Sequence, residues 1–329
     1  MLRFAEKLIR AARSARTTWL AEAASALYIG VIALVAQTTG IFYVLFPELG
    51  ALGHDVLKRP RGTWASAPLL LVATPFLTAV GGTLITRHLQ YGMVAVLLDV
   101  GYSVLVIGAM RSPIAPAISA GLLPLCLSIR SWWYPPSLLI GTGVLAATAA
   151  LRRRRAGAPI PALTDPHDLA DDIVEEPPAG YGWVPFFVAF LLVTIAASEI
   201  TGWRLVLFPP LVVIAFEAFA HSAVCPWAGR PIALTLACGV TALAGVLCAT
   251  HLGTGPLGAM SSMLAGVAVL RVLDLHIPPA LAVGLLPFVI PHPDYRFPLA
   301  VTLGTAIQAG ALWSWRRIVQ PAAAQVRGL

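Results

Sequence analysis

Long runs of apolar residues dominate this chain of 329 residues, of which only 11% are charged. A soluble domain carries about a quarter charged residues, so this chain cannot cover a water-exposed surface. Hydrophobic residues make up 58% of it, the mean hydropathy is +0.82, and the glycines and prolines follow no collagen-like period. The sequence therefore predicts an all-α polytopic membrane protein and excludes a soluble or disordered chain.

The apolar residues form two groups of six segments with a polar, acidic linker between them. We predict an amphipathic cytoplasmic N-terminal helix (1–19), a first membrane repeat (20–155), a cytoplasmic linker (156–182), a second membrane repeat (183–317) and a cytoplasmic tail (318–329). The linker carries six of the 15 acids and is rich in proline, so we expect it to be exposed, with one or two helical turns in Asp165–Glu176.

The two groups match each other at a nearly constant spacing, which predicts a tandem duplication. The pairs that share a numbering offset of 163 are His88-Leu89 with His251-Leu252, Pro116-Ala117 with Pro279-Ala280, GLLPL (121–125) with GLLPF (284–288), and Arg153-Arg154 with Arg316-Arg317. Farther upstream, Phe46-Pro47 matches Phe208-Pro209 at an offset of 162. One residue has therefore been gained or lost between the matched blocks, and each repeat contains about six helical segments.

Lys and Arg residues predict the orientation of the repeats. If all six segments of each half cross from the cytoplasm, 18 Lys and Arg residues lie inside and four lie outside, namely Arg87, Arg130, Arg204 and Arg296. If the second and fifth segments re-enter from outside, the count becomes 13 against nine. The positive-inside rule favours the first arrangement. It places both termini in the cytoplasm of a bacterial-type inner membrane and makes the two repeats parallel.

Several segments are too short to cross a bilayer unaided, because a spanning helix needs about 20 residues. Pro47–Leu57 and Pro278–Ile290 are two of them, and such half-length helices survive when they are buried in protein or line a cavity. Proline stands at or near their starts, where it suits the first helical turn.

Helix N-termini inside a membrane bind anions, because their N–H groups are free and carry partial positive charge. We therefore predict an anion-binding constriction at the starts of the short segments. Its residues are Phe46, Pro47, Phe208 and Pro209 from the outer side, and Pro113, Pro116, His276, Pro278, Pro279 and Ala280 from the inner side. The alternative is that these prolines only start helices.

The run from Arg271 to Ala280 (RVLDLHIPPA), preceded by Phe208-Pro-Pro-Leu and a Gly-Arg-Pro turn at 229–231, resembles the HPP family of small integral membrane proteins. The resemblance covers about 183–317 and, through the duplication, about 20–154. It implies a membrane unit with a His-Pro-Pro motif after an apolar helix, and passage of nitrite or a similar anion. This chain has Ile277 between the histidine and the prolines, and Pro113 stands where His276 would be in the first half.

Titratable residues inside apolar segments are expensive and therefore point to function. Asp99 lies in the middle of VLLDVGYS, and Glu217 and His221 are four residues apart on one helix face. We predict that Asp99, Glu217 and His221 serve proton coupling or gating; the alternative for Glu217 and His221 is a structural pair near the cytoplasmic end. Glu48, Glu199 and Arg204 are expected near the outer interface.

The sequence predicts no metal site and no cofactor. The four cysteines are Cys126, Cys225, Cys238 and Cys248, and they form no CxxC or Cys/His cluster. The net charge of +7 comes from residues flanking apolar segments, so no nucleic-acid partner is expected.

We therefore predict a membrane transporter or channel for a small inorganic anion of the nitrite or nitrate kind, embedded in the lipid bilayer and not an enzyme. Two other functions stay open: a membrane-embedded enzyme acting on lipid or isoprenoid substrates, and an accessory subunit of a membrane complex. A homo-oligomer is also left open.

Overall fold

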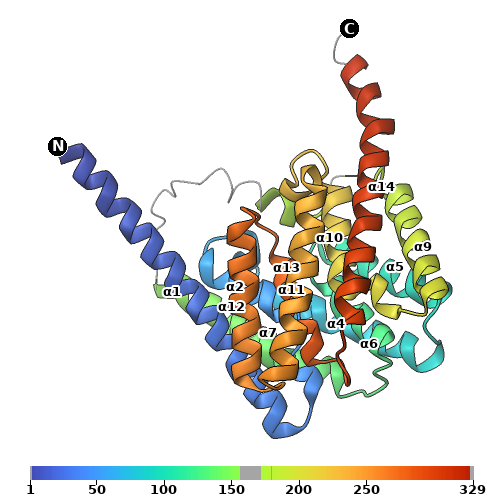
Figure 1. The fold of residues 1–329 in the computed structure, drawn as a ribbon, viewed down its shortest axis with the longest axis horizontal. Helices are drawn as coiled ribbons and strands as arrows, with labels where there is room; N and C mark the ends of the chain where they lie inside the picture. The colour runs from blue at the N-terminus through green and yellow to red at the C-terminus, as the bar shows by residue number, and fades with distance from the viewer. Residues whose placement is uncertain (1, 156–171, 179, 327–329) are drawn as a thin grey trace.

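A computed structural model describes residues 2–155, 172–178 and 180–326 (Figure 1). Over these ranges the chain forms helices and connecting turns and no β-strand. Six helices are long and apolar enough to cross a membrane, and they lie within Thr18–Thr39, Pro68–His88, Met93–Met110, Tyr134–Arg154, Val184–Thr201 and Pro231–His251. Large aliphatic side chains cover the outside; Leu69, Ile200, Ile232 and Val272 are each more than 75% exposed. The chain is therefore a helical multi-pass membrane protein.

Short helices alternate with long ones in both halves. The first half comprises α1 (Leu2–Thr39), η1 (Phe42–Val44), α2 (Leu49–Lys58), α3 (Thr63–Ser66), α4 (Pro68–His88), α5 (Met93–Met110), α6 (Ala117–Leu127) and α7 (Tyr134–Arg155). The second half comprises α9 (Val184–Thr201), η2 (Arg204–Leu207), α10 (Pro209–Ala220), η3 (Pro226–Gly229), α11 (Pro231–His251), α12 (Pro256–Val272), α13 (Pro278–Leu285), η4 (Leu286–Phe288) and α14 (Arg296–Val326).

The terminal helices are longer than the predicted boundaries. α1 is one continuous helix through the expected break near residue 19, and α14 runs through the expected start of the tail at residue 318. Figure 1 shows the N-terminal end of α1 and the C-terminal end of α14 extending beyond the packed helices on the same side.

The packed helices have two opposite ends. We call the end next to residues 172–178 the linker end. We call the opposite end the vestibule end, after the pocket that is described in the next subsection. At the linker end, Arg152 on α7 donates a 3.1 Å hydrogen bond to the Leu57 carbonyl at the close of α2. At the vestibule end, Tyr43 before α2 donates a 3.1 Å hydrogen bond to Ser131 before α7. The segment containing α2 therefore joins opposite ends of the bundle, although its helix has only ten residues. This path agrees with six traverses in the first half.

The four short helices lie in the centre of the molecule and pack across the two halves. α2 contacts α13, and α6 contacts α10. Every residue of α13 is buried, as are residues 117–126 of α6 and 209–219 of α10. Protein on all sides is what a helix too short for the bilayer requires, because its free end groups would be costly in lipid.

Glycine permits an unusually close contact between α4 and α6 in this centre. A methyl group on Gly82 of α4 would lie 1.9 Å from the carbonyl oxygen of Gly121 on α6. No side chain fits there, so the backbones of α4 and α6 touch directly.

Two residues near the end of the linker are buried, whereas others, including Glu176, Pro177 and Tyr181, are exposed as expected. Residues 172–175 form a helical turn, and Val174 and Glu175 are only 3% and 5% exposed. Arg59, after α2, forms ion pairs with Asp172 at 3.0 Å, with Glu175, and with Asp55 at 2.5 Å. A charge as buried as Arg59 requires such partners, and the linker supplies two of them. Asp165 and the rest of 156–171 lie outside the described residues.

Candidate functional site

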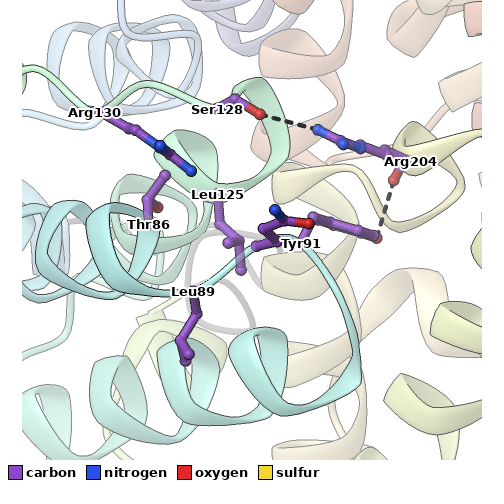
Figure 2. A pocket seen from close by; sticks show the side chains of 8 residues that line it. Thr86, Leu89, Tyr91, Leu125, Ser128, Arg130 and Arg204 are labelled. Atoms are coloured by element: carbon purple, nitrogen blue, oxygen red, sulfur yellow. Dashed lines mark hydrogen bonds between the residues drawn. The ribbon is translucent and has the colours of Figure 1, made fainter.

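A partly open pocket of about 260 Å³ lies at the vestibule end, between the two halves; we call it the vestibule (Figure 2). Its lining comes from the end of α4 and the turn after it, from the end of α6 and the turn after it, and from η2 of the second half. The lining residues are Thr86, Leu89, Gln90, Tyr91, Leu125, Ser128, Arg130 and Arg204.

Two arginines give the vestibule a positive charge. Arg204 donates a 2.9 Å hydrogen bond to Ser128 Oγ, and its guanidinium lies 5.6 Å from the centre of the Tyr91 ring. Among the described residues, no carboxylate lies within 4 Å of the Arg130 or Arg204 guanidinium. Guanidinium groups without an acidic partner are suited to binding an anion through charge-assisted hydrogen bonds.

Tyr91 fixes Arg204 without adding negative charge. Its hydroxyl lies 3.2 Å from Ser198 Oγ. It also donates a 3.2 Å hydrogen bond to the Arg204 carbonyl (Figure 2). Burial raises the pKa of Tyr91 well above its usual value, so the phenol stays neutral. The rim of the vestibule therefore presents hydroxyls and guanidinium groups.

Asp99 lies one helical turn below the floor of the vestibule. Thr86 on the floor donates a 2.7 Å hydrogen bond to the Gly82 carbonyl, and a methyl group on Gly82 would lie 2.9 Å from an Asp99 oxygen. Leu125 is also on the floor, and a methyl group on Gly121, four residues earlier, would lie 3.3 Å from the same oxygen. Four residues of helix span about 6 Å, so a short step separates the floor from the carboxyl.

The Asp99 carboxyl is fully buried, and neither of its oxygens has a hydrogen-bond partner among the described residues. A carboxylate in this setting is costly, and protonation removes that cost. Its 0% exposure places the Asp99 carboxyl inside the protein, away from lipid.

Glu48 is a second fully buried acid, and its predicted place at the exposed outer interface is wrong. It directly precedes α2, is 0% exposed, and accepts a 2.6 Å hydrogen bond from Ser119 of α6. The chain between η1 and α2 turns into the protein, which takes Glu48 away from the surface. Glu199 and Arg204 are exposed as expected.

The residues predicted to form an anion-binding constriction are buried in protein but are not brought to one cavity. α10 and α13 begin at Pro209 and Pro278, whereas α2 begins two residues after Pro47 and α6 one residue after Pro116. The remaining members of the set are also largely buried; they are Phe46, Phe208, Pro113, Pro279, Ala280 and, less completely, His276.

One small cavity of about 10 Å³, close to the room needed for a single water, lies near the start of α13. It is lined by Trp64, Val174, Glu175, Glu217, Trp227, Pro278 and Pro279. Glu217 is 2% exposed, so the predicted Glu217 belongs to this cavity and not to the vestibule. The carboxyl of Glu175, from the linker, thus lies where the sequence predicted an anion near the α13 N-terminus.

Histidines from both halves meet near the same end. The rings of His54 on α2 and His276 before α13 lie 6.3 Å apart between their centres. His221 follows α10, and its backbone N–H donates a 3.0 Å hydrogen bond to the Glu217 carbonyl. Burial lowers the pKa of His221, which favours the neutral imidazole. His276, Glu217 and His221 therefore share the linker end, whereas Asp99 lies below the vestibule.

The sequence prediction missed Arg130, Thr86, Tyr91 and Ser128 as site residues. The sequence carried one signal for these residues. Arg130 and Arg204 are two of the four arginines that the charge count assigns to the outside, where arginine is rare. Comparison of the chain with protein-family models, curated protein sequences and solved structures found no match.

Proposed function

We propose that this protein carries a small inorganic anion, of the nitrite or nitrate kind, across a bacterial-type inner membrane. The observation that supports this most strongly is the vestibule, where Arg130 and Arg204 stand without acidic partners above the buried carboxyl of Asp99. The resemblance of the Arg271–Ala280 run to the HPP family agrees with this class of substrate.

The proposed orientation puts the linker end in the cytoplasm and the vestibule outside. Arg59, Arg152, Arg230 and Arg316 all make contacts at the linker end. Cytoplasmic ends of membrane helices carry the excess of Lys and Arg, so the positive-inside rule assigns the linker end to the cytoplasm. Both termini and the linker would then be cytoplasmic.

We also propose that the two halves are parallel tandem repeats. Positions related by the offset of 163 have matching backbone features: Arg111 and Asp274 have φ values of 47° and 49° after α5 and α12. The α2–α13 and α6–α10 contacts exchange the two halves, as expected for a two-fold relation between them. Both observations support the duplication inferred from the matched sequence blocks.

The close glycine contact also occurs twice. A methyl group on Gly245 of α11 would lie 2.2 Å from the Gly284 carbonyl oxygen of α13. In the first half, a methyl group on Gly82 would lie 1.9 Å from the Gly121 carbonyl oxygen. The offset of 163 relates Gly245 to Gly82 and Gly284 to Gly121. A repeated backbone contact of this kind supports a common architecture for the halves.

In the proposed mechanism, the positive vestibule first concentrates the anion. A basic cleft with low-dielectric walls focuses the field and raises the local anion concentration. Arg130 and Arg204 then replace part of the hydration shell, with a hydroxyl donor from Ser128. Ser128 and Tyr91 hold Arg204 in place, which limits the entropy lost on binding.

Asp99 would couple the anion to a proton. A lone anion moving against a membrane potential costs about 2.3 kcal/mol per 100 mV, whereas an anion and a proton together are neutral. The Asp99 carboxyl, about 6 Å below the floor, can hold that proton while the anion binds above it.

The linker end would open in a second conformation. In this structure the cavity at the start of α13 has room for little more than one water, and Arg59 holds the linker against it through Asp172 and Glu175. Passage therefore requires these helices or the linker to move. His276, Pro278–Ala280 and Glu217 would then line the exit, with His221 beside them.

Flux into proteoliposomes tests the proposal. Nitrite, nitrate, formate and chloride would be offered to vesicles containing the purified protein, with and without an inward proton gradient. Saturable uptake of at least one anion above that of protein-free vesicles supports transport. Uniform inertness toward all four would contradict it.

A further inference from the structure

A second pocket lies at the vestibule end and has a volume of about 140 Å³. It is formed by the end of α1, η1, the turn before α12, and η4, and its lining residues are Ala36, Gln37, Gly40, Phe42, Leu45, Thr254 and Phe288. We call it the second pocket.

The second pocket and the vestibule are lined by residues related by the repeat offset. At the offset of 163, Tyr91 corresponds to Thr254 and Leu125 corresponds to Phe288. At the offset of 162, which holds for the upstream blocks, Phe42 corresponds to Arg204. The second pocket is therefore the equivalent, in the proposed repeat, of the vestibule.

The two equivalent pockets have opposite chemistry. Arg204 of the vestibule corresponds to Phe42, and Arg130 corresponds to Pro293. Thr86 corresponds to Ala249. The described lining of the second pocket contains no charged side chain. An anion leaving water there would lose its hydration without gaining a cation, which is costly.

The groups beneath the pockets differ in the same way. Asp99 corresponds to Ser262, whose hydroxyl donates a 2.7 Å hydrogen bond to the Gly284 carbonyl. The second half therefore has a hydroxyl, and no titratable group, at the position equivalent to Asp99.

We propose that each chain has a single anion path, through the vestibule and Asp99, and that the second pocket binds no anion. The second half then acts as a scaffold that also contributes Arg204 to the path. This inference rests on the proposed function, because it assigns anion transport to the vestibule and not to the equivalent second pocket.

Binding stoichiometry and matched variants test this inference on the purified full-length protein. Radiolabelled nitrite and nitrate would be titrated onto the protein in detergent and onto three variants: Arg204→Gln, Phe42→Gln and Ser262→Ala. Phe42→Gln and Ser262→Ala are the equivalent-position controls for Arg204 and Asp99. Size-exclusion profiles and thermal unfolding confirm that each variant folds.

The expected result is one anion per chain. Arg204→Gln is expected to weaken binding about tenfold or more, because it removes a charge-assisted hydrogen-bond donor. Phe42→Gln and Ser262→Ala are expected to leave binding within about twofold of the wild type, since substitutions away from a site usually have small effects.

Two anions per chain would overturn the single-path inference, as would equal losses in Arg204→Gln and Phe42→Gln. One bound anion per chain without flux in vesicles would instead contradict transport while the single binding site stands. The absence of any binding in the wild type would contradict both.

Discussion

Arg204 of the second half donates a 2.9 Å hydrogen bond to Ser128 of the first half, and this bond crosses the vestibule rim. The two residues are 76 positions apart. Neither half alone can therefore build the vestibule. The arrangement makes the basic pocket depend on correct packing of both halves, and it gives Arg204 a fixed direction.

Replacement of Asp99 by Asn is expected to separate anion passage from the proton gradient. Asn has a similar shape but cannot release a proton, so uptake that depends on the gradient in the wild type should lose that dependence. The measurement is initial uptake at a series of imposed pH differences. Ser262→Ala, at the equivalent position of the second half, is the control. An unchanged gradient dependence in Asp99→Asn would show that Asp99 carries no proton.

Substitution of Gly82 by Ala is expected to destabilise the protein. The added methyl would lie 1.9 Å from the Gly121 carbonyl oxygen, and backbone cannot move away cheaply. Overpacking of this kind costs about 1–3 kcal/mol. Gly101→Ala on α5 is the control, because a methyl there meets no atom within 4 Å. Thermal unfolding in detergent should show a lower midpoint for Gly82→Ala alone, and equal midpoints would contradict the close α4–α6 contact.

Replacement of Arg59 by Met is expected to loosen the linker end. Arg59 is 6% exposed and pairs with Asp55, Asp172 and Glu175, so its replacement removes a buried cation that these carboxylates share. Breaking a buried pair in this way costs about 3–5 kcal/mol. Thermal unfolding and limited proteolysis of the linker would measure the effect.

The control for Arg59→Met is Arg154→Met, since Arg154 is exposed. If linker cleavage and the unfolding midpoint are the same in both variants, the linker is not held by Arg59.

Labelling of single cysteines tests the orientation. In a variant with the four native cysteines replaced by alanine, Tyr295→Cys at the vestibule end should react with a membrane-impermeant maleimide added outside cells. Val224→Cys at the linker end should react only after the membrane is permeabilised. Tyr295 and Val224 are 57% and 39% exposed, so both positions are accessible. The reverse pattern would place the linker outside.

The helical membrane fold could be predicted from the sequence because its signals are local and repeated. Apolar runs of spanning length indicate α4 and α11 directly, and short runs indicate α2 and α13. The inward position of Asp99 was also predictable, since a carboxyl facing lipid would be too costly.

The vestibule could not be predicted because it depends on contacts between distant turns. Arg130 and Arg204 belong to different halves, and the packing of α6 against α10 and of α5 against α9 brings their turns together. Glu48 was wrongly placed for a related reason: its hydrogen bond with Ser119 bridges 71 residues. The burial of Glu175 likewise depends on Arg59, which lies 116 residues earlier.

The most direct test of anion binding in the vestibule is uptake of nitrite and nitrate by proteoliposomes containing wild type, Arg130→Gln, Arg204→Gln or the double variant. We expect saturable uptake in the wild type, about tenfold or greater loss of apparent affinity in each single variant, and no saturable uptake in the double variant. Wild-type uptake retained by the correctly folded double variant would show that the vestibule does not bind the anion, which would contradict the proposed anion path.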